Sequence, residues 1–184
     1  MPKPDTAPLD LALSRWHEDM HSGEPSREAR TLRSQLRRCR TTDDARLIGG
    51  LYRVLREGGV TGSVYDSHVL AMMLLPYIAQ NSDTREGDEI TRGASFAKTA
   101  GQEKDGQPRM RDLRFRRLIE HETIADLTLP LIRALRLLKG EAVSLSHLTR
   151  DLNAWSYFAR SPDAKGSHPR ARWAHDYYTA SLPA

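Results

Sequence analysis

Residues 109–121 read RMRDLRFRRLIEH, a stretch that sets five arginines beside a cluster of apolar side chains. If the stretch is helical, Phe115, Leu118 and Ile119 fall on one side and Arg116 and Arg117 face away from them. The pattern therefore predicts a helix that docks on a core through its apolar side and presents its arginines outward. Such an outer face suits a polyanion, because guanidinium groups pair bidentately with phosphates. The competing interpretation is that the arginine stems cover the rim of a helical bundle.

Helical spacing of apolar residues recurs along most of the chain. The segments with this spacing are residues 9–20, 26–39, 42–58, 63–80, 111–121, 124–139, 144–155 and 169–178. Residues 81–110 lack it and contain four glycines, so we expect a long loop there, with a short helix or ordered strip at GASFAKTA, residues 93–100. We predict an all-α protein of two small helical bundles, residues 1–80 and 111–184, joined by a long loop, residues 81–110.

The composition narrows the class of protein. The 184 residues are 39% hydrophobic and 28% charged, which is typical of a globular chain. The longest apolar run, residues 69–75, is too short to cross a bilayer, and the first residues lack the apolar stretch of a secretory signal. Cys39 is the one cysteine, so an internal disulfide is impossible. We expect a cytoplasmic protein that does not insert into a membrane.

A second arginine-rich stretch lies at residues 27–40, which hold six arginines against one glutamate. On a helix, Arg27, Arg30, Arg33, Arg37 and Arg40 share one face, and like charges at these spacings repel one another. A bound polyanion would relieve this repulsion, so we favour nucleic acid as the partner. The alternative is a solvated helix whose arginines pair with acids elsewhere in the chain.

Known catalytic patterns are nearly absent from the sequence. Residues 17–21, HEDMH, match the H-E-x-x-H zinc motif, in which His17 and His21 would bind the metal and Glu18 would act as base. However, no third ligand follows at the required spacing, and Gly23 and Pro25 end the predicted helix. There is no Walker A loop, no G-x-G-x-x-G motif and no G-x-S-x-G elbow. We therefore predict no enzyme activity, no catalytic residue, no metal and no cofactor.

The C-terminal half resembles a known family. The residues that carry the resemblance are 114–158, from RFRRLIEH to DLNAWSYF, and 170–178, RARWAHDYY. Upstream, residues 93–100 and 36–55, LRRCRTTDDARLIGGLYRVL, add to it. Together these motifs are similar to the CasB family, the small subunit of the type I-E CRISPR Cascade complex, over most of residues 10–180.

The resemblance implies an all-helical, non-enzymatic subunit for antiviral defence. Its implied partners are other Cascade subunits, a second copy of the chain, the guide RNA, and the target and displaced DNA strands. By position, Arg37 and Arg38 match the family's helix arginines, Lys98 the cation of residues 93–100, and Arg114 the start of the basic helix. Guide pairing reads the sequence in such complexes, so we expect backbone contacts that are indifferent to base sequence.

Both arguments together give one set of candidate residues for nucleic-acid binding: Arg30, Arg33, Arg37, Arg38, Lys98, Arg109, Arg111, Arg114, Arg116 and Arg117. The main alternative function is a helix-turn-helix regulator, in which the segment around Gly140 would form the turn. A zinc hydrolase and a structural adaptor with protein-facing arginines are the other hypotheses.

Overall fold

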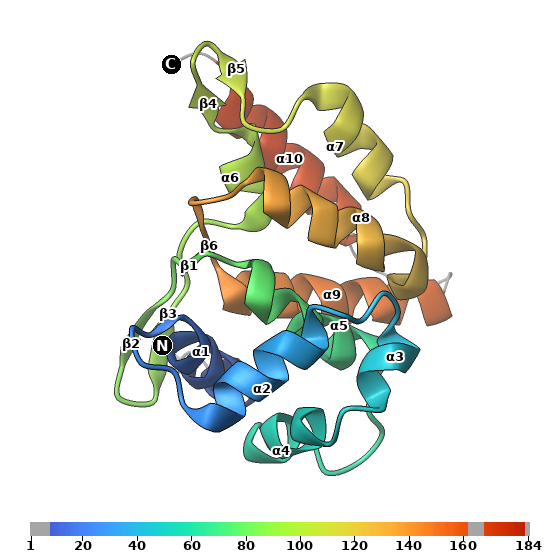
Figure 1. Ribbon diagram of the computed structural model, residues 1–184. Helices are drawn as coiled ribbons and strands as arrows, with labels where there is room; N and C mark the ends of the chain where they lie inside the picture. Colours follow the sequence, from blue (N-terminus) through green and yellow to red (C-terminus); the bar gives the residue numbers. More distant parts are fainter. Residues whose placement is uncertain (1–7, 162–167, 183–184) are drawn as a thin grey trace.

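The computed structural model describes residues 8–161 and 168–182 and is largely helical, as predicted (Figure 1). Its helices are α1 (Pro8–His21), α2 (Arg27–Leu36), α3 (Thr42–Arg46), α4 (Gly49–Glu57), α5 (Asp66–Leu74), α6 (Phe96–Gly101), α7 (Asp112–Ile119), α8 (Ile124–Leu137), α9 (Leu145–Arg160) and α10 (Pro169–Ser181). A 3-10 turn, η1 (Leu75–Tyr77), continues α5. The short strands are β1 (Gln80–Asn81), β2 (Thr84–Glu86), β3 (Glu89–Thr91), β4 (Glu103–Lys104), β5 (Gln107–Pro108) and β6 (Ala142–Val143). β1 pairs with β6 in parallel, whereas β2–β3 and β4–β5 are antiparallel hairpins.

Helix boundaries follow the capping residues. The Ser26 side chain accepts a hydrogen bond from the Ala29 amide at the start of α2, and Ser144 accepts one from His147 at the start of α9, in agreement with the segments predicted to begin at residues 26 and 144. The expected helix over residues 42–58 is instead two helices, α3 and α4, because the chain breaks at Leu47 and Ile48. Leu47, which was predicted to be buried, is 87% exposed.

The core forms around α5 and α9. All residues of α5 except Asp66 and His68 are buried, as are Leu75 and Pro76 of η1, and α5 contacts α9, α8 and α3. Trp155 of α9 and Trp173 of α10 are fully buried and lie 5.3 Å apart between ring centroids. Helices from residues 8–80 thus pack directly on helices from the second half. The division into bundles 1–80 and 111–184 stays a prediction.

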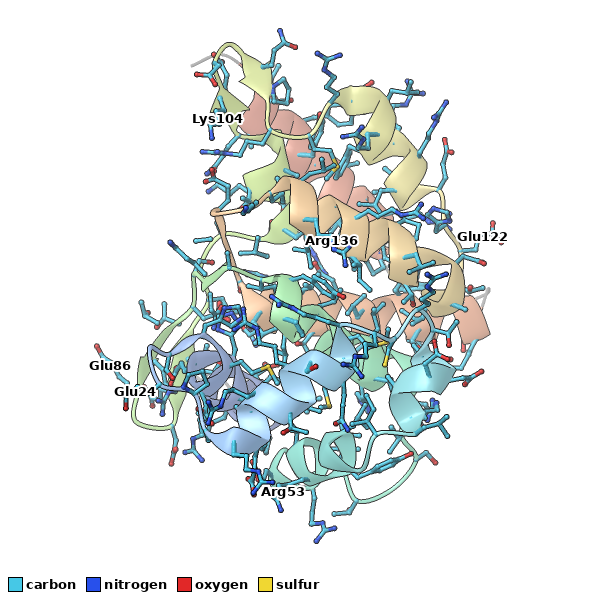
Figure 2. All side chains as sticks on the ribbon, viewed as in Figure 1. Glu24, Arg53, Glu86, Lys104, Glu122 and Arg136 are labelled. Carbon is cyan, nitrogen blue, oxygen red and sulfur yellow. The ribbon has the colours of Figure 1, made fainter. Side chains whose placement is uncertain are left out.

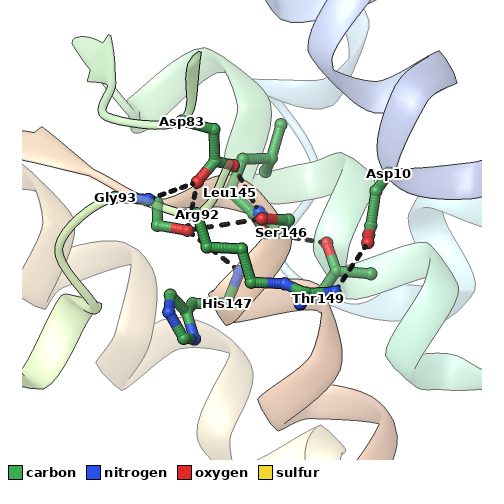
Figure 3. A network of polar contacts seen from close by, with 9 residues as sticks. Asp10, Asp83, Arg92, Gly93, Leu145, Ser146, His147 and Thr149 are labelled. Carbon is green, nitrogen blue, oxygen red and sulfur yellow. Dashed lines mark hydrogen bonds and ion pairs between the residues drawn. The ribbon is translucent and has the colours of Figure 1, made fainter. Parts of the chain in front are cut away.

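Residues 81–110 are more ordered than the predicted loop. They form two hairpins and the short helix α6, which lies in the region of residues 93–100 where a short helix or ordered strip was expected. α6 packs along α10 (Figure 1). Asp83 ties this segment to the start of α9 (Figure 3). Its carboxylate accepts from the Gly93 amide at 3.0 Å, from the Ser146 amide at 2.8 Å and from the Ser144 hydroxyl. Side-chain hydrogen bonds therefore replace the apolar periodicity that this segment lacks.

Candidate nucleic-acid interface

The arginine-rich second segment is only partly a helical face. α2 ends at Leu36, and the amides of Arg38 and Cys39 then bond to the Gln35 and Leu36 carbonyls in a tight turn. Arg40 consequently lies beyond the helix, so the predicted face of five arginines on one helix is wrong at its C-terminal end. Four of the predicted residues do gather on the exposed side of α2 and its turn. They line a shallow hollow of about 380 Å³ with Ser34: Arg30, Arg33, Arg37 and Arg38.

A deeper groove lies between α2 and α8, and we call it the α2–α8 groove. It measures about 560 Å³ and is lined by His21, Arg33, Arg37, Pro76, Tyr77, Ala79, Leu135, Arg136 and Lys139. Figure 2 shows Arg136 extending from α8 near the centre of the view. Its guanidinium lies 4.8 Å from the centroid of the Tyr77 ring. Among the described residues that line this groove there is no carboxylate, so its positive charge is unopposed from within.

The electrostatics of the α2–α8 groove reflect this concentration of cations. Arg33 donates to the Met20 carbonyl at 2.8 Å, and Arg37 to the Pro76 carbonyl at 3.4 Å. Burial first, and then the neighbouring charge of Arg37, lowers the pKa of Arg33 below its ordinary value. The two side chains therefore repel each other at a site where an anion would stabilise both.

A second groove, between α7 and α8, shares α8 as a wall. It measures about 370 Å³ and is lined by Met110, Arg114, Arg117, Leu118, His121, Pro130, Arg133, Ala134 and Leu137. Phe115 and Leu118 are buried beneath α7, as predicted, and Arg114 and Arg117 are exposed. The grooves on either side of α8 therefore hold cations from both arginine-rich segments.

Three cations of α8 and the turn after it were missed by the sequence-based prediction. Arg133, Arg136 and Lys139 follow one another at intervals of three residues and are exposed. This spacing is visible in the sequence as IRALRLLK, which was used only to identify the family. Arg133 and Arg136 lie on the solvent side of α8, whose opposite side docks on α5 and α9, and Lys139 follows in the turn after this helix.

The other predicted residues have varied surroundings. Arg109 forms an ion pair with Glu141, and the Arg116 guanidinium lies 3.9 Å from the Asp112 carboxylate. Arg111 precedes α7 and is exposed. Lys98 is exposed on α6 and lines neither groove. The structure therefore brings the arginines of α2 and α7 toward α8 and leaves Lys98 apart from them.

The two histidines of the HEDMH motif share a helix face, and their rings stack with centroids 4.5 Å apart. His17 is buried, although the helical pattern of residues 9–20 indicated an amphipathic surface helix for this motif. Its Nε2 donates to the Ile78 carbonyl at 2.8 Å, and Nε2 of His21 donates to the Leu75 carbonyl at 3.1 Å. Burial lowers the pKa of both side chains. Over residues 8–161 and 168–182, no three His, Cys, Asp or Glu side chains are grouped to bind a metal.

The helix after Gly140 is poorly placed to enter a DNA groove. α9 contacts α1, α5, α8 and α10, and its buried residues include Leu145, Leu148 and Trp155. A recognition helix contacts bases through its N-terminal residues, whereas Leu145, Ser146, Leu148 and Thr149 at the start of α9 are buried. Within the described part of the chain, none of the helices has the length and apolar character needed to cross a membrane.

Comparisons with known proteins agree with the helical architecture. The family model of CRISPR-associated protein Cse2 matches residues 32–178. One chain of the crystal structure of E. coli Cascade bound to a PAM-containing double-stranded DNA target superimposes with a TM-score of 0.57 at 18% identity, covering 91% of this chain and 95% of that one. A search of curated protein sequences gives no match. The resemblance found in the sequence is confirmed: this chain belongs to the CRISPR-associated protein Cse2 family, which is the CasB family of Cascade small subunits.

Proposed function

We propose that this chain is the non-catalytic small subunit of a Cascade antiviral complex in the cytoplasm. In this role it contacts other subunits, associates with a second copy of itself, and holds guide RNA, target and displaced single-stranded DNA without regard to base sequence. Membership of the Cse2 family supports a place in Cascade.

The observation that carries the nucleic-acid role is the carboxylate-free α2–α8 groove. Arg37 comes from the first half of the chain and Arg136 from the second, yet both line one groove. Acidic side chains lie close to other cations of this chain, such as Arg15 with Asp88 and Arg53 with Glu28. The cations of the groove are therefore available to phosphates in a way that the paired ones are not.

The remaining predicted residues extend this surface. Arg30 of α2 and Arg38 of the turn after it flank the groove, and Arg114 and Arg117 approach α8 from its other side. Tyr77 already stacks with Arg136, and few other rings are exposed nearby, so we expect phosphate contacts to dominate over base stacking.

The test is binding of the purified chain to labelled single-stranded DNA of several sequences over a range of salt concentrations. The variant Arg37→Ala/Arg136→Ala removes one cation from each side of the groove. Each phosphate contact on a single strand contributes about 0.7 to the magnitude of the salt slope, so we expect this variant to lower it by about 1.4. The matched control, Arg15→Ala/Arg53→Ala, makes the same charge change at arginines already paired with acids, and its slope should change far less.

Two outcomes would contradict the proposal. Equal losses of slope in both double variants would show that only net charge matters and that the groove is not the binding site. A strong preference for one duplex sequence would favour the helix-turn-helix regulator instead.

A further inference from the structure

His21 belongs to the HEDMH motif, yet it lines the α2–α8 groove rather than a metal site. It is half-buried at the end of α1, beside Arg33 and Arg37 of α2. Its imidazole is thus placed where the proposed function puts a nucleic-acid backbone.

The hydrogen bond of His21 fixes how its ring can meet a ligand. Nε2 faces the Leu75 carbonyl, which only accepts, so the neutral ring carries its proton on Nε2. Nδ1 then has a lone pair and no proton, and among the described residues it has no hydrogen-bond partner. A lone pair repels a phosphate oxygen, whereas a protonated Nδ1 would donate to it. A phosphate at this ring therefore requires a second proton.

The surroundings of His21 oppose that proton until an anion arrives. From α1, Glu18 pairs with Arg85 and Asp19 accepts from Ser26, so both nearby acids are engaged. His17 of the same helix stacks on His21, and the polar groups that other elements bring to the groove are Arg33, Arg37, Tyr77, Arg136 and Lys139. Burial first, and then Arg33 and Arg37, lowers the pKa of His21 below 6.5, while the Leu75 bond raises it. A phosphate that neutralises Arg33 and Arg37 removes their effect and so raises the pKa of His21.

We infer that His21 is a phosphate-contacting residue of the α2–α8 groove and that it takes up a proton when a nucleic-acid backbone binds. The inference rests on the proposed function and adds a ligand group and a linked proton to it. His17, which is buried and bonded to Ile78, stays neutral as the structural partner of the stack.

Proton uptake makes affinity depend on pH with a definite sign. The pKa of His21 is low in the free protein and higher in the complex. Affinity therefore rises as pH falls from above the bound pKa toward the free one, by at most about tenfold per pH unit for a single site. Below the free pKa this dependence disappears, because His21 is then protonated in both states.

The experiment measures single-stranded DNA affinity of the full chain from pH 5.5 to pH 8.5 at constant ionic strength. Wild type is compared with His21→Gln, whose amide can still donate to the Leu75 carbonyl, and with His121→Gln, which alters an imidazole on the neighbouring α7–α8 groove. We expect the pH dependence to flatten in His21→Gln and to persist in His121→Gln. Calorimetry of the wild type in two buffers of different ionisation enthalpy should show net proton uptake on binding near pH 7, independently of any variant.

The outcomes separate this inference from the proposed function. Binding that is salt-dependent but equally pH-dependent in wild type and His21→Gln, or that takes up no proton, overturns the role of His21 and leaves the groove as the binding site. Absence of single-stranded DNA binding at low salt overturns the proposed nucleic-acid function itself.

Discussion

Gly101 closes α6 where the backbone of this helix meets the backbone of α10. A β-carbon on Gly101 would overlap the carbonyl oxygen of Tyr177 and lie 2.9 Å from its carbonyl carbon. Both are backbone atoms, so a change of side-chain rotamer cannot relieve the contact and α10 must shift. We therefore expect Gly101→Ala to destabilise the fold.

The shift would also disturb the contacts that Tyr177 makes with α7. Its ring stacks on Phe115 with centroids 3.9 Å apart, and its hydroxyl donates to the Met110 carbonyl at 2.6 Å. Overpacking of this kind costs up to about 3 kcal/mol, from which the helix preference of alanine recovers about 1 kcal/mol. The expected net loss is about 2 kcal/mol, which corresponds to about 4–8 °C in melting temperature for a chain of this length.

Urea unfolding followed by circular dichroism measures this loss. The matched control is Gly49→Ala at the start of α4, where a β-carbon would meet no atom within 4 Å. There the reduced freedom of the unfolded chain should raise stability by about 0.4–1 kcal/mol. A Gly101→Ala protein as stable as the wild type would refute the close approach of α6 and α10.

Three further substitutions test other parts of the fold. Burial raises the pKa of Asp10 to about 6, with Arg92 opposing the shift, so the contribution of Asp10 to stability is present at low pH and is lost as pH rises through 6. The unfolding free energy of Asp10→Asn, measured in urea, should therefore rise relative to that of the wild type by up to about 3 kcal/mol between pH 4 and pH 7.5. Asp151 is buried and accepts from the Trp173 indole at 2.5 Å, so Asp151→Ala leaves a buried donor without its partner and should lower stability by about 1–3 kcal/mol in thermal unfolding, and Asp151→Asn by less. Leu47→Lys should change the unfolding free energy by less than about 0.5 kcal/mol, and a larger loss would contradict the exposure of Leu47.

The C-terminal helices could be predicted closely because local residues define their ends. Ser144 caps α9, Gly140 adopts a positive φ of 88° after α8, and Pro169 begins α10. Residues 42–58 were harder, because Leu47 continues the apolar spacing although the chain breaks there. The reason for the break is tertiary: Ile48 turns into the core and leaves Leu47 in solvent.

Residues 81–110 show what periodicity cannot reveal. Strands of two or three residues are too short for an alternating pattern, and α6 has only six residues, all buried except Lys98, so it shows no apolar stripe. The order of the segment depends on Asp83 and the amides that it contacts. One of these amides, that of Ser146, is more than sixty residues away from Asp83 in the sequence. Such a partnership has no local signature in the sequence.

The candidate site was predictable only in its arginines from α2 and α7. The α2–α8 groove exists because α2 and α8 both pack on η1, and this arrangement is a property of the packed core. Arg136 and Lys139 could therefore be recognised as cations at the end of an exposed helix face, but the groove that they share with Arg37 could not be foreseen.

The end of α5 explains why basic side chains gather at this groove. The last carbonyls of a helix lack intrahelical donors and bear partial negative charge, which favours cations and N–H groups nearby. Side chains of α1 and of the turn after α2 supply these donors: His21 to Leu75, Arg37 to Pro76 and His17 to Ile78. Exposure then separates their roles. His17 is buried, so its hydrogen bond serves only to hold η1. Arg37 is exposed and its bond to the Pro76 carbonyl is long at 3.4 Å, so the guanidinium can leave this carbonyl for a phosphate at little cost. Because one set of bonds both anchors η1 and orients the cations, substitutions at Arg37 should be judged by binding and stability together.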